Sequence, residues 1–142
     1  MKHDYFETSQ QVARVYTRML EPVCRQWELT KNELDVLLFL HNNPEYDRAT
    51  DIVIHRGMSK SHVSLSVTKL RQRDLVRVSP DPEDRRTLRL ELTDQAWEIC
   101  SQGRKIQEAF FTRLFSGISR EEAELWLKIK ETIGRNILEM AE

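Results

Sequence analysis

The stretch of residues 81–93 constrains the fold of this chain most strongly. It begins with an acidic turn that contains proline, carries two adjacent arginines, and continues with leucine at every second position, at Leu88, Leu90 and Leu92. A period of two indicates a half-buried strand. A second β-prone run, residues 75–79, lies just upstream. The two runs predict a hairpin that holds cations away from the body of the protein, an arrangement that suits a partner with a polyanionic groove.

The first part of the chain shows helical periodicity. Apolar residues at helical spacing predict a first helix over residues 5–26, and we expect it to bend or end near Pro22. Thr30 and Glu33 form a capping box, in which each side chain accepts a hydrogen bond from the other residue's backbone N–H, and this predicts the start of a second helix. Pro44 disfavours the helical conformation at the residue before it and should end that helix.

A helix-turn-helix pattern follows. Asp47 is a candidate N-cap for a short third helix that Gly57 interrupts, and Ser59 is the candidate cap of a fourth helix over residues 60–73. One face of this fourth helix is apolar, with Val63, Val67 and Leu70, and the remaining surface is mostly polar and carries no acid. A short helix, a glycine-containing turn and a helix with a polar first turn are typical of helix-turn-helix proteins.

Two long helices are predicted after the hairpin. Thr93 is the expected cap of the first, whose middle Gly103 should weaken, and Ser119 with Glu122 forms a capping box that opens the last helix. The first and last helices of the chain both carry long apolar stripes close to the chain ends. Such faces require a partner, and a second copy of the chain is the simplest one.

Composition indicates a single domain with a localised basic surface. A chain of 142 residues fits one domain, has no apolar run of about 18 residues, and begins without an apolar signal core, so we expect a cytoplasmic protein. The formal net charge is −1, but residues 48–89 hold ten Lys/Arg against five Asp/Glu, a local charge of +5. A basic centre between acidic ends is what a phosphate-binding surface requires.

Other kinds of site find little support. The four histidines are scattered with no cysteine beside them in a ligand pattern, so neither a metal site nor a cofactor is expected. There is no Ser/His/Asp arrangement, Gly-rich phosphate loop or recognisable carboxylate pair, so we do not expect an enzyme. The two cysteines, Cys24 and Cys100, are too few to scaffold the fold.

The order of these elements resembles the MarR family of bacterial transcription regulators. The resemblance is carried by Leu29-Thr30 before the second helix, by Asp84-Arg85-Arg86 in the turn of the hairpin, and by the Leu92-Thr93 that ends it. It implies a mainly α fold with a small β hairpin, in which residues 1–142 form one winged helix-turn-helix domain. Residues of about 30–93 would form the DNA-binding lobe, and about 5–26 and 94–142 the dimerisation helices.

The resemblance also implies where DNA would bind. The fourth helix would enter the major groove, Arg86 would enter the minor groove, and Asp84 would hold the wing in shape. The predicted DNA-binding residues are Ser59, Lys60, Ser61, His62, Ser64, Leu65, Thr68, Lys69, Asp84, Arg85 and Arg86. The chain departs from the family pattern at Arg56, where an apolar residue is usual, and at Asp74, where glycine is common; Asp can adopt the left-handed conformation.

These expectations define a leading function and two alternatives. The leading one is a homodimeric repressor that binds a pseudo-palindromic operator in double-stranded DNA and is released by a small molecule, often aromatic or anionic. Tyr16, Trp27 and Trp97 are candidates to line its cleft, although core packing explains them equally well, and the ligand-binding residues are unknown. The alternatives are a winged-helix module that binds an acidic protein, and a redox-sensing regulator that uses Cys24 or Cys100.

Overall fold

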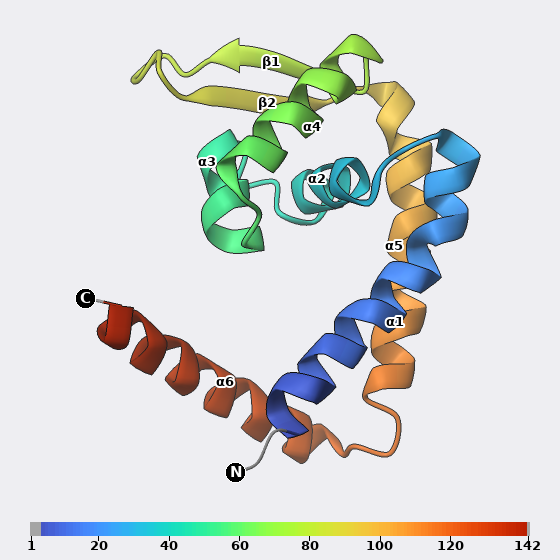
Figure 1. The fold of residues 1–142 in the computed structure, drawn as a ribbon, viewed down its shortest axis with the longest axis vertical. Coiled ribbons are helices and arrows are strands. Elements are labelled where there is room, and N and C mark those ends of the chain that lie inside the picture. The colour runs from blue at the N-terminus through green and yellow to red at the C-terminus, as the bar shows by residue number, and fades with distance from the viewer. Residues whose placement is uncertain (1–3, 142) are drawn as a thin grey trace. The chain divides into compact units, whose positions relative to one another are not determined.

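The computed structural model describes residues 4–141 of the chain (Figure 1). In chain order the elements are α1 (Asp4–Trp27), α2 (Lys31–Asn42), α3 (Ala49–Asp51), the π-helical turn η1 (Ile52–Arg56), α4 (Lys60–Gln72), β1 (Val76–Pro80), β2 (Leu88–Leu92), α5 (Asp94–Leu114) and α6 (Arg120–Ala141). The chain divides into two compact units, residues 1–108 and 109–142, and the division falls within α5. The mainly α fold with one hairpin that the sequence predicts is confirmed.

Helix α1 continues beyond the residue at which we expected it to bend or end. Pro22 lies inside the helix, which extends to Trp27, because proline removes only one internal hydrogen bond while the neighbouring Leu20 and Val23 are buried in the core. The helix ends at Glu28, whose φ is 53°, and the N–H of Leu29 donates to the carbonyl of Cys24 at 2.9 Å. This is the hydrogen bond of a Schellman cap, formed without glycine.

Helix α2 forms the centre of the first unit. Its residues from Glu33 to Leu40 are all buried, so neighbouring elements cover it on every side. The predicted capping box is present, since the N–H of Glu33 donates to Thr30 Oγ1 at 3.1 Å and the N–H of Thr30 donates to Glu33 Oε1 at 3.2 Å. Both groups are satisfied at the point where α2 enters the core, which fixes where the helix begins.

The third helix begins differently from the prediction. Asp47 is not its N-cap, because its carboxylate accepts a hydrogen bond from Arg89 at 3.0 Å and its carbonyl accepts one from the N–H of Leu90 at 2.7 Å. Arg48 takes the N-cap position instead, and its N–H donates to Asp51 Oδ2 at 3.0 Å. The helix then widens into η1, and this turn ends at Gly57. The φ of Gly57 is 73°, a conformation that glycine adopts without strain.

The wing comprises β1, β2 and the turn of residues 81–87 between them (Figure 1). The strands are antiparallel, with Val76 opposite Leu92 and Pro80 opposite Leu88. The predicted alternation holds where the strand meets the core, since Leu90 is buried and Leu92 half-buried, but Leu88, nearer the turn, is exposed. As predicted from its residue type, Asp74 lies in the left-handed region, with a φ of 57°, between α4 and β1.

Helix α5 packs closely on α2 through the glycine that we expected to weaken it. Gly103 is buried, and a Cβ added there would lie 2.8 Å from a methyl group of Leu38, too close for any other residue without rearrangement. Thr93 precedes α5, but its hydroxyl donates to the carbonyl of Asp74 at 2.7 Å, which ties the start of α5 to the end of α4. Gly103 is therefore best explained by close helix packing.

The second unit holds the end of α5 and all of α6. Its predicted capping box is confirmed, because the N–H of Glu122 donates to Ser119 Oγ at 3.1 Å and the N–H of Ser119 donates to Glu122 Oε2 at 2.8 Å. The apolar stripe of α6 is exposed along its length: Trp126, Ile129, Ile133, Ile137 and Met140. None of the helices formed by residues 4–141 is long and apolar enough to cross a membrane.

Candidate nucleic-acid interface

Helix α4 begins as the sequence predicts. Ser59 is its N-cap, with extended backbone dihedrals, and its hydroxyl accepts a hydrogen bond from the N–H of His62 at 3.2 Å. The remaining free N–H groups of the first turn point out of the helix end, where they favour a nearby anion. Lys60 follows the cap and is exposed. This end of α4 therefore combines backbone donors with a cation, a combination that suits a phosphate group.

The two faces of α4 differ sharply. Val63, Ser66, Val67 and Leu70 are buried against the core, and the predicted DNA-binding residues of the helix are all exposed. Four exposed side chains follow one another at spacings of four, three and four residues and therefore form a stripe on the outer face: Ser61, Leu65, Thr68 and Gln72. Leu65 is 57% exposed, so this stripe presents a large apolar side chain to the surroundings.

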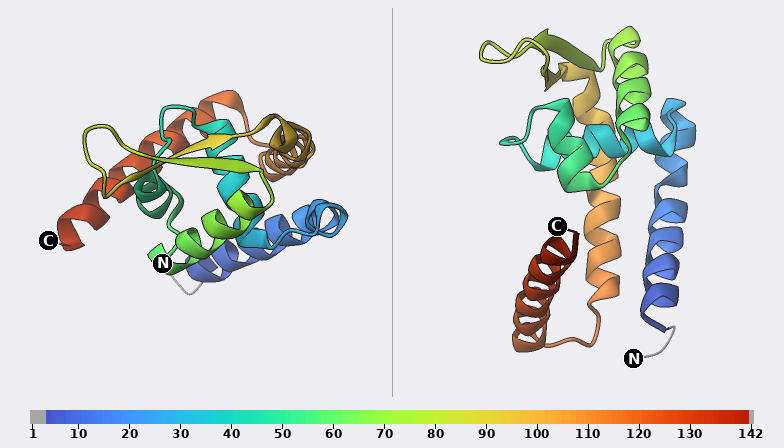
Figure 2. Two further views of the ribbon diagram at one scale, coloured as in Figure 1. Left: turned by 90° about the horizontal axis from the view of Figure 1, so that it is seen from above. Right: turned by 60° about the vertical axis from the view of Figure 1, so that its left-hand side comes forward.

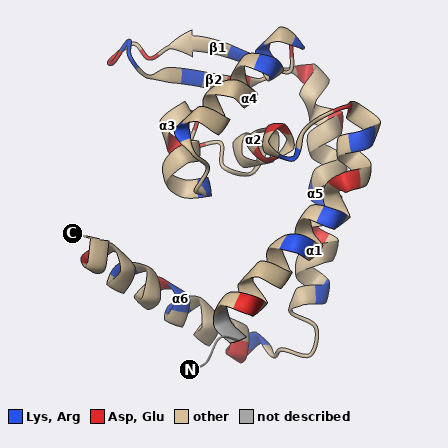
Figure 3. Ribbon diagram, in the orientation of Figure 1, with Lys and Arg blue, Asp and Glu red and all other residues tan. Residues whose placement is uncertain are grey.

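Gln72 is a member of this stripe that the sequence analysis did not select. Its spacing of four residues from Thr68 would have identified it, but our prediction concentrated on the first turns of the helix. A glutamine side chain can donate to and accept from an adenine edge in the major groove. Arg71, beside it, is exposed and was likewise counted only in the charge of the region. Both residues extend the candidate interface to the end of α4, where Figure 3 shows Lys and Arg gathered.

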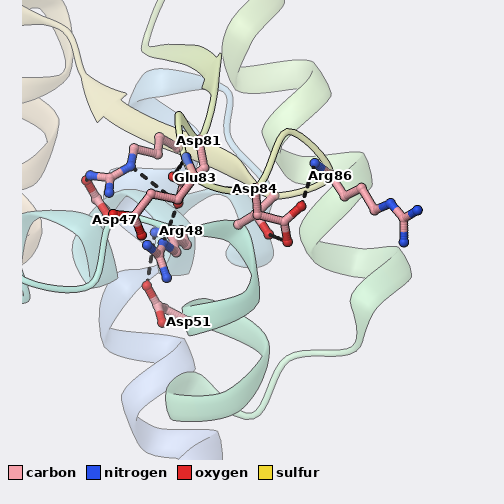
Figure 4. Close-up of polar contacts among 9 residues, drawn as sticks. Asp47, Arg48, Asp51, Asp81, Glu83, Asp84 and Arg86 are labelled. Atoms are coloured by element: carbon pink, nitrogen blue, oxygen red, sulfur yellow. Dashed lines mark hydrogen bonds and ion pairs between the residues drawn. The ribbon is translucent and has the colours of Figure 1, made fainter.

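The wing tip, residues 84–87, is shaped by Asp84. The Asp84 carboxylate accepts hydrogen bonds from the backbone N–H of Arg86 at 3.1 Å and from the hydroxyl of Thr87 at 3.2 Å. Its carbonyl accepts from the N–H of Thr87 at 2.9 Å. Asp84 thus holds the turn through the backbone of Arg86, and the guanidinium of Arg86 extends away from it (Figure 4). That guanidinium is displayed to the surroundings on a fixed turn.

The wing base is a second Asp/Arg cluster, in which Asp47, Arg48 and Asp81 (Figure 4) lie together with Arg89. Asp81 is 1% exposed, and its Oδ2 atom lies 2.9 Å from Arg48 Nε and 3.6 Å from Arg89 Nε. Its Oδ1 atom accepts a hydrogen bond from the N–H of Glu83 at 2.9 Å. The N–H of Glu83, together with the Arg48 and Arg89 guanidinium groups, lowers the pKa of Asp81 although burial acts in the opposite direction.

The wing base joins three segments that are distant in sequence. Asp47 and Arg48 precede α3, Asp81 starts the turn of the wing, and Arg89 lies on β2, where it also pairs with Arg48 through an isolated β-bridge. The period of two puts Arg89 on the face of the strand opposite its leucines, and the sequence analysis singled out neither Arg89 nor Asp81. The sequence carries little sign of the burial of Asp81, because an Asp before a Pro predicts a turn whether or not its carboxylate is buried.

The local charge of +5 therefore overstates the number of cations available to a partner. Four of the ten have internal partners: Arg48 and Arg89 in the wing base, Arg56 at 3.3 Å from Asp35, and Arg73 on two backbone carbonyls. Within residues 4–141, no ion pair or hydrogen bond engages the side chains of the other six: Lys60, Lys69, Arg71, Arg77, Arg85 and Arg86. Most of these six lie on α4 and at the wing tip.

An apolar groove of about 690 Å³ lies between these two cationic elements. Val63 and Val67 of α4, Val53 and Ile54 of η1, and Leu88 of the wing line it. The groove separates the outer part of the wing from the exposed face of α4, so that the helix and the wing tip form two separate projections from one lobe. Such spacing is what contact with two different grooves of a nucleic acid requires.

The three aromatic residues proposed to line a ligand cleft do not gather in one place. Tyr16 and Trp27 are half-buried on α1 and each bonds to α5, with Gln107 Nε2 donating to the Tyr16 hydroxyl at 2.7 Å and Trp27 Nε1 donating to Gln102 at 3.0 Å. Trp97 is 54% exposed and packs edge-on against His41. The first two serve the packing of α1 on α5, which favours the core explanation for them.

Neither thiol has the properties of a redox sensor. Burial raises the pKa of Cys100 to about 12, and its Sγ lies 3.7 Å from the carbonyl of Leu37. Burial also raises the pKa of Cys24. A reactive cysteine is a thiolate near neutral pH, which needs a lowered pKa. The raised pKa of each thiol therefore does not favour the redox-sensing alternative.

The fold and the site define a class of protein. A helix capped by serine after a glycine turn, followed by a hairpin with an outward arginine, is the winged helix-turn-helix arrangement of DNA-binding proteins. Residues 27–87 match the model of the MarR family. Over this stretch, which holds α2, the helix-turn-helix and most of the wing, the chain is similar to the MarR family of transcription regulators.

Individual relatives agree with this assignment. The chain is 22% identical over 122 residues to the HTH-type transcriptional repressor IacR of Pseudomonas putida, a match that covers 86% of this chain and 72% of IacR. It resembles the structure of a putative MarR family regulator from Listeria monocytogenes complexed with a 26mer DNA, with a TM-score of 0.80, 13% identity and coverage of 93% and 87%. For BpsR of Bordetella bronchiseptica the TM-score is 0.70, with 18% identity and coverage of 93% and 99%.

Proposed function

We propose that the protein is a homodimeric transcription repressor that binds a pseudo-palindromic operator in double-stranded DNA and is released by a small molecule. The observation that carries the proposal is the pairing, on one lobe, of the exposed stripe of α4 with the outward guanidinium of Arg86 (Figure 4). A helix of this width fits the major groove, and an arginine on a narrow hairpin fits the minor groove. Such a regulator works where the chromosome lies, in the cytoplasm.

We assign different tasks to the members of this interface. Ser61, Leu65 and Thr68 on the outer stripe would face base edges, with Leu65 against a thymine methyl. The exposed Lys60, Lys69 and Arg85 would neutralise phosphates, and His62 and Ser64 would border them. Contacts of the first kind provide sequence selectivity, and contacts of the second kind provide affinity that falls with salt. The structure of the Listeria relative with DNA supports this class of partner.

A dimer is supported by the exposed apolar stripe of α6. Its large apolar side chains are exposed in the single chain, and contiguous exposed apolar surface of this kind marks an interaction site. A symmetric dimer would carry two identical copies of α4, and two identical readers related by a two-fold axis select an inverted repeat.

Selection from a random duplex pool with the purified protein tests the proposal. We expect an enriched inverted repeat whose half-sites lie about one helical turn apart, with specific binding at least about 10³-fold tighter than binding to a scrambled duplex. A matched selection with Leu65→Ser, which removes the exposed apolar side chain without touching a buried one, should change the preferred half-site. If the parent protein enriches no sequence at all, the proposed function is wrong.

Release by a small molecule is supported by a relative. The BpsR structure concerns regulation of DNA binding by 6-hydroxynicotinic acid, a small aromatic acid. We therefore propose a ligand of this class. A panel of aromatic carboxylates should contain a compound that raises the melting temperature of the free protein and also weakens operator binding, because a ligand that binds the DNA-free form more tightly than the DNA-bound form lowers DNA affinity by the same factor. A compound that raises the melting temperature without changing operator affinity would not be an inducer.

A further inference from the structure

Arg73 is an exposed cation of the basic region whose guanidinium is held by hydrogen bonds within the protein. It occupies the C-cap position of α4, and its guanidinium donates to two backbone carbonyls of another helix. Nη2 donates to Trp27 O at 2.6 Å and Nη1 donates to Glu28 O at 2.9 Å. These carbonyls lie at the C-terminal end of α1, where the last turn of a helix has no internal partners for its oxygens.

The chemistry of this contact favours a fixed geometry. The end of a helix carries partial negative charge, so a guanidinium there is stabilised by the helix dipole as well as by its hydrogen bonds. The guanidinium is planar and holds its donors in a rigid fork, so two bonds to successive carbonyls fix both the distance and the direction between α1 and α4. A lysine would supply the charge without the fork.

The residue after Arg73 ties the same turn to α5. Asp74 has a φ of 57°, and its carbonyl accepts the hydrogen bond from Thr93 at 2.7 Å. The N–H of Thr93 donates in turn to Leu75 O at 3.1 Å. The end of α4 is therefore bound to the end of α1 through Arg73 and to the start of α5 through Asp74, and these three helix ends meet at one junction (Figures 1 and 2).

We infer that Arg73 is a positioning residue that sets the spacing between the two operator half-sites. The inference rests on the proposed function, in which α4 reads the DNA, and on the expectation from the sequence that α1 and α5 belong to the dimerisation helices. In such a dimer the two copies of α4 are connected only through the helices that carry them. The junction at Arg73 fixes the angle between reader and carrier, and a rigid angle allows one separation of half-sites.

The role differs in a measurable way from that of a phosphate contact. Arg71 is the matched control, since it lies two residues away on the same helix, is exposed, and engages no partner among residues 4–141. A phosphate contact contributes to the dependence of affinity on salt, by about 0.9 per contact in the slope of log K against log salt. A positioning residue contributes to the preference for one spacing and leaves that slope unchanged.

The experiment uses the full-length protein and the operator it selects. Affinity is measured for that operator and for duplexes with one base pair added or removed between the half-sites, at several salt concentrations. The variants are Arg73→Met, Arg73→Lys and Arg71→Met, each checked for parental melting temperature and dimer mass. The parent should prefer its own spacing on the order of tenfold, within the range of coupling between linked sites.

Arg73→Met should reduce this preference to about threefold or less while keeping the parental salt slope. The spacing preference of Arg73→Lys should lie between those of the parent and of Arg73→Met. Arg71→Met should keep the spacing preference and reduce the slope by about 0.9 per protomer. The inference is overturned if Arg73→Met keeps the full spacing preference, or if it lowers the slope as Arg71→Met does. If the parent selects no inverted repeat, the proposed function fails first, and this inference fails with it.

Discussion

At the base of the wing, the carboxylate of Asp81 lies inside the fold against the guanidinium of Arg48, whereas three residues further along, at the tip, Asp84 bonds to the backbone and Arg86 extends outward. Both places contain an aspartate and an arginine, but the two pairs have different roles. At the base the aspartate and the arginine form an ion pair that joins segments distant in sequence. At the tip the carboxylate shapes the turn and leaves the arginine available.

The net charge of a region is therefore a poor measure of the number of cations that it offers to DNA. Which arginines remain available depends on where the carboxylates lie, and a buried carboxylate can engage two of them. At the wing base Arg48 and Arg89 pair with Asp81 and hold the hairpin in place. The wing tip can then present Arg86 at a fixed position. Substitutions at the wing base should therefore lower the melting temperature, and substitutions at the wing tip should lower operator affinity alone.

Removing the buried charge at the base should have the largest effect. Asp81→Asn leaves Arg48 and Arg89 without their shared carboxylate in a partly buried site, so we expect the melting temperature to fall by about 5–10 °C. Operator affinity should fall by about tenfold or more because the wing is no longer held. Thermal unfolding followed by circular dichroism checks the first effect. A variant that melts with the parent would mean that the network does not hold the wing.

Removing the arginine at the tip should affect binding alone. Arg86→Ala should weaken operator binding by about 1–3 kcal/mol, the size of one good groove contact, and leave the melting temperature within about 1 °C of the parent. Fluorescence anisotropy at several salt concentrations measures the first quantity. An unchanged affinity across those concentrations would remove Arg86 from the interface, whatever its position on the turn.

The pH dependence of stability should follow the base and not the tip. The folded-state pKa of Asp81 lies below its ordinary value, so its contribution is fully present above that value and is lost as the pH falls through the folded pKa. The difference in melting temperature between the parent and Asp81→Asn should be constant from pH 7 to about pH 4 and shrink below it. A difference that grows towards acid pH would reverse the sign and contradict the assigned cause.

The smallest change in operator affinity is expected from a substitution of Asp84 that keeps its turn. In Asp84→Asn the amide oxygen can still accept from the N–H of Arg86, and the amide nitrogen can donate to the Thr87 hydroxyl in place of the bond that Oδ2 accepted, so operator affinity should change by about twofold or less. Asp84→Ala, which removes the acceptor, should weaken binding more than Asn does, because the turn that presents Arg86 loosens. Equal losses for Asn and Ala would show that the charge of Asp84, and not its turn, matters at the tip.

Local features of the fold were predictable from the sequence because their causes are local. The capping serine and threonine, the alternating leucines of β2 and the left-handed Asp74 each depend on residues within a few positions. Asp47 was misassigned because its partner, Arg89, lies on a distant strand. The same limit applies to Arg73 and Arg48: a sequence shows that they are cations, and only the folded chain shows that their partners are internal.

The salt dependence of operator binding tests the central claim most directly. The claim is that DNA meets the cations of α4 and the wing tip, and that arginines with internal partners take no part. The double variant Arg85→Met/Arg86→Met should reduce the slope of log K against log salt by about 0.9 for each arginine in each protomer. Arg56→Met, which removes an arginine paired with Asp35, should leave the slope unchanged. A parental slope in the wing-tip variant, or an equal reduction in Arg56→Met, would contradict the account.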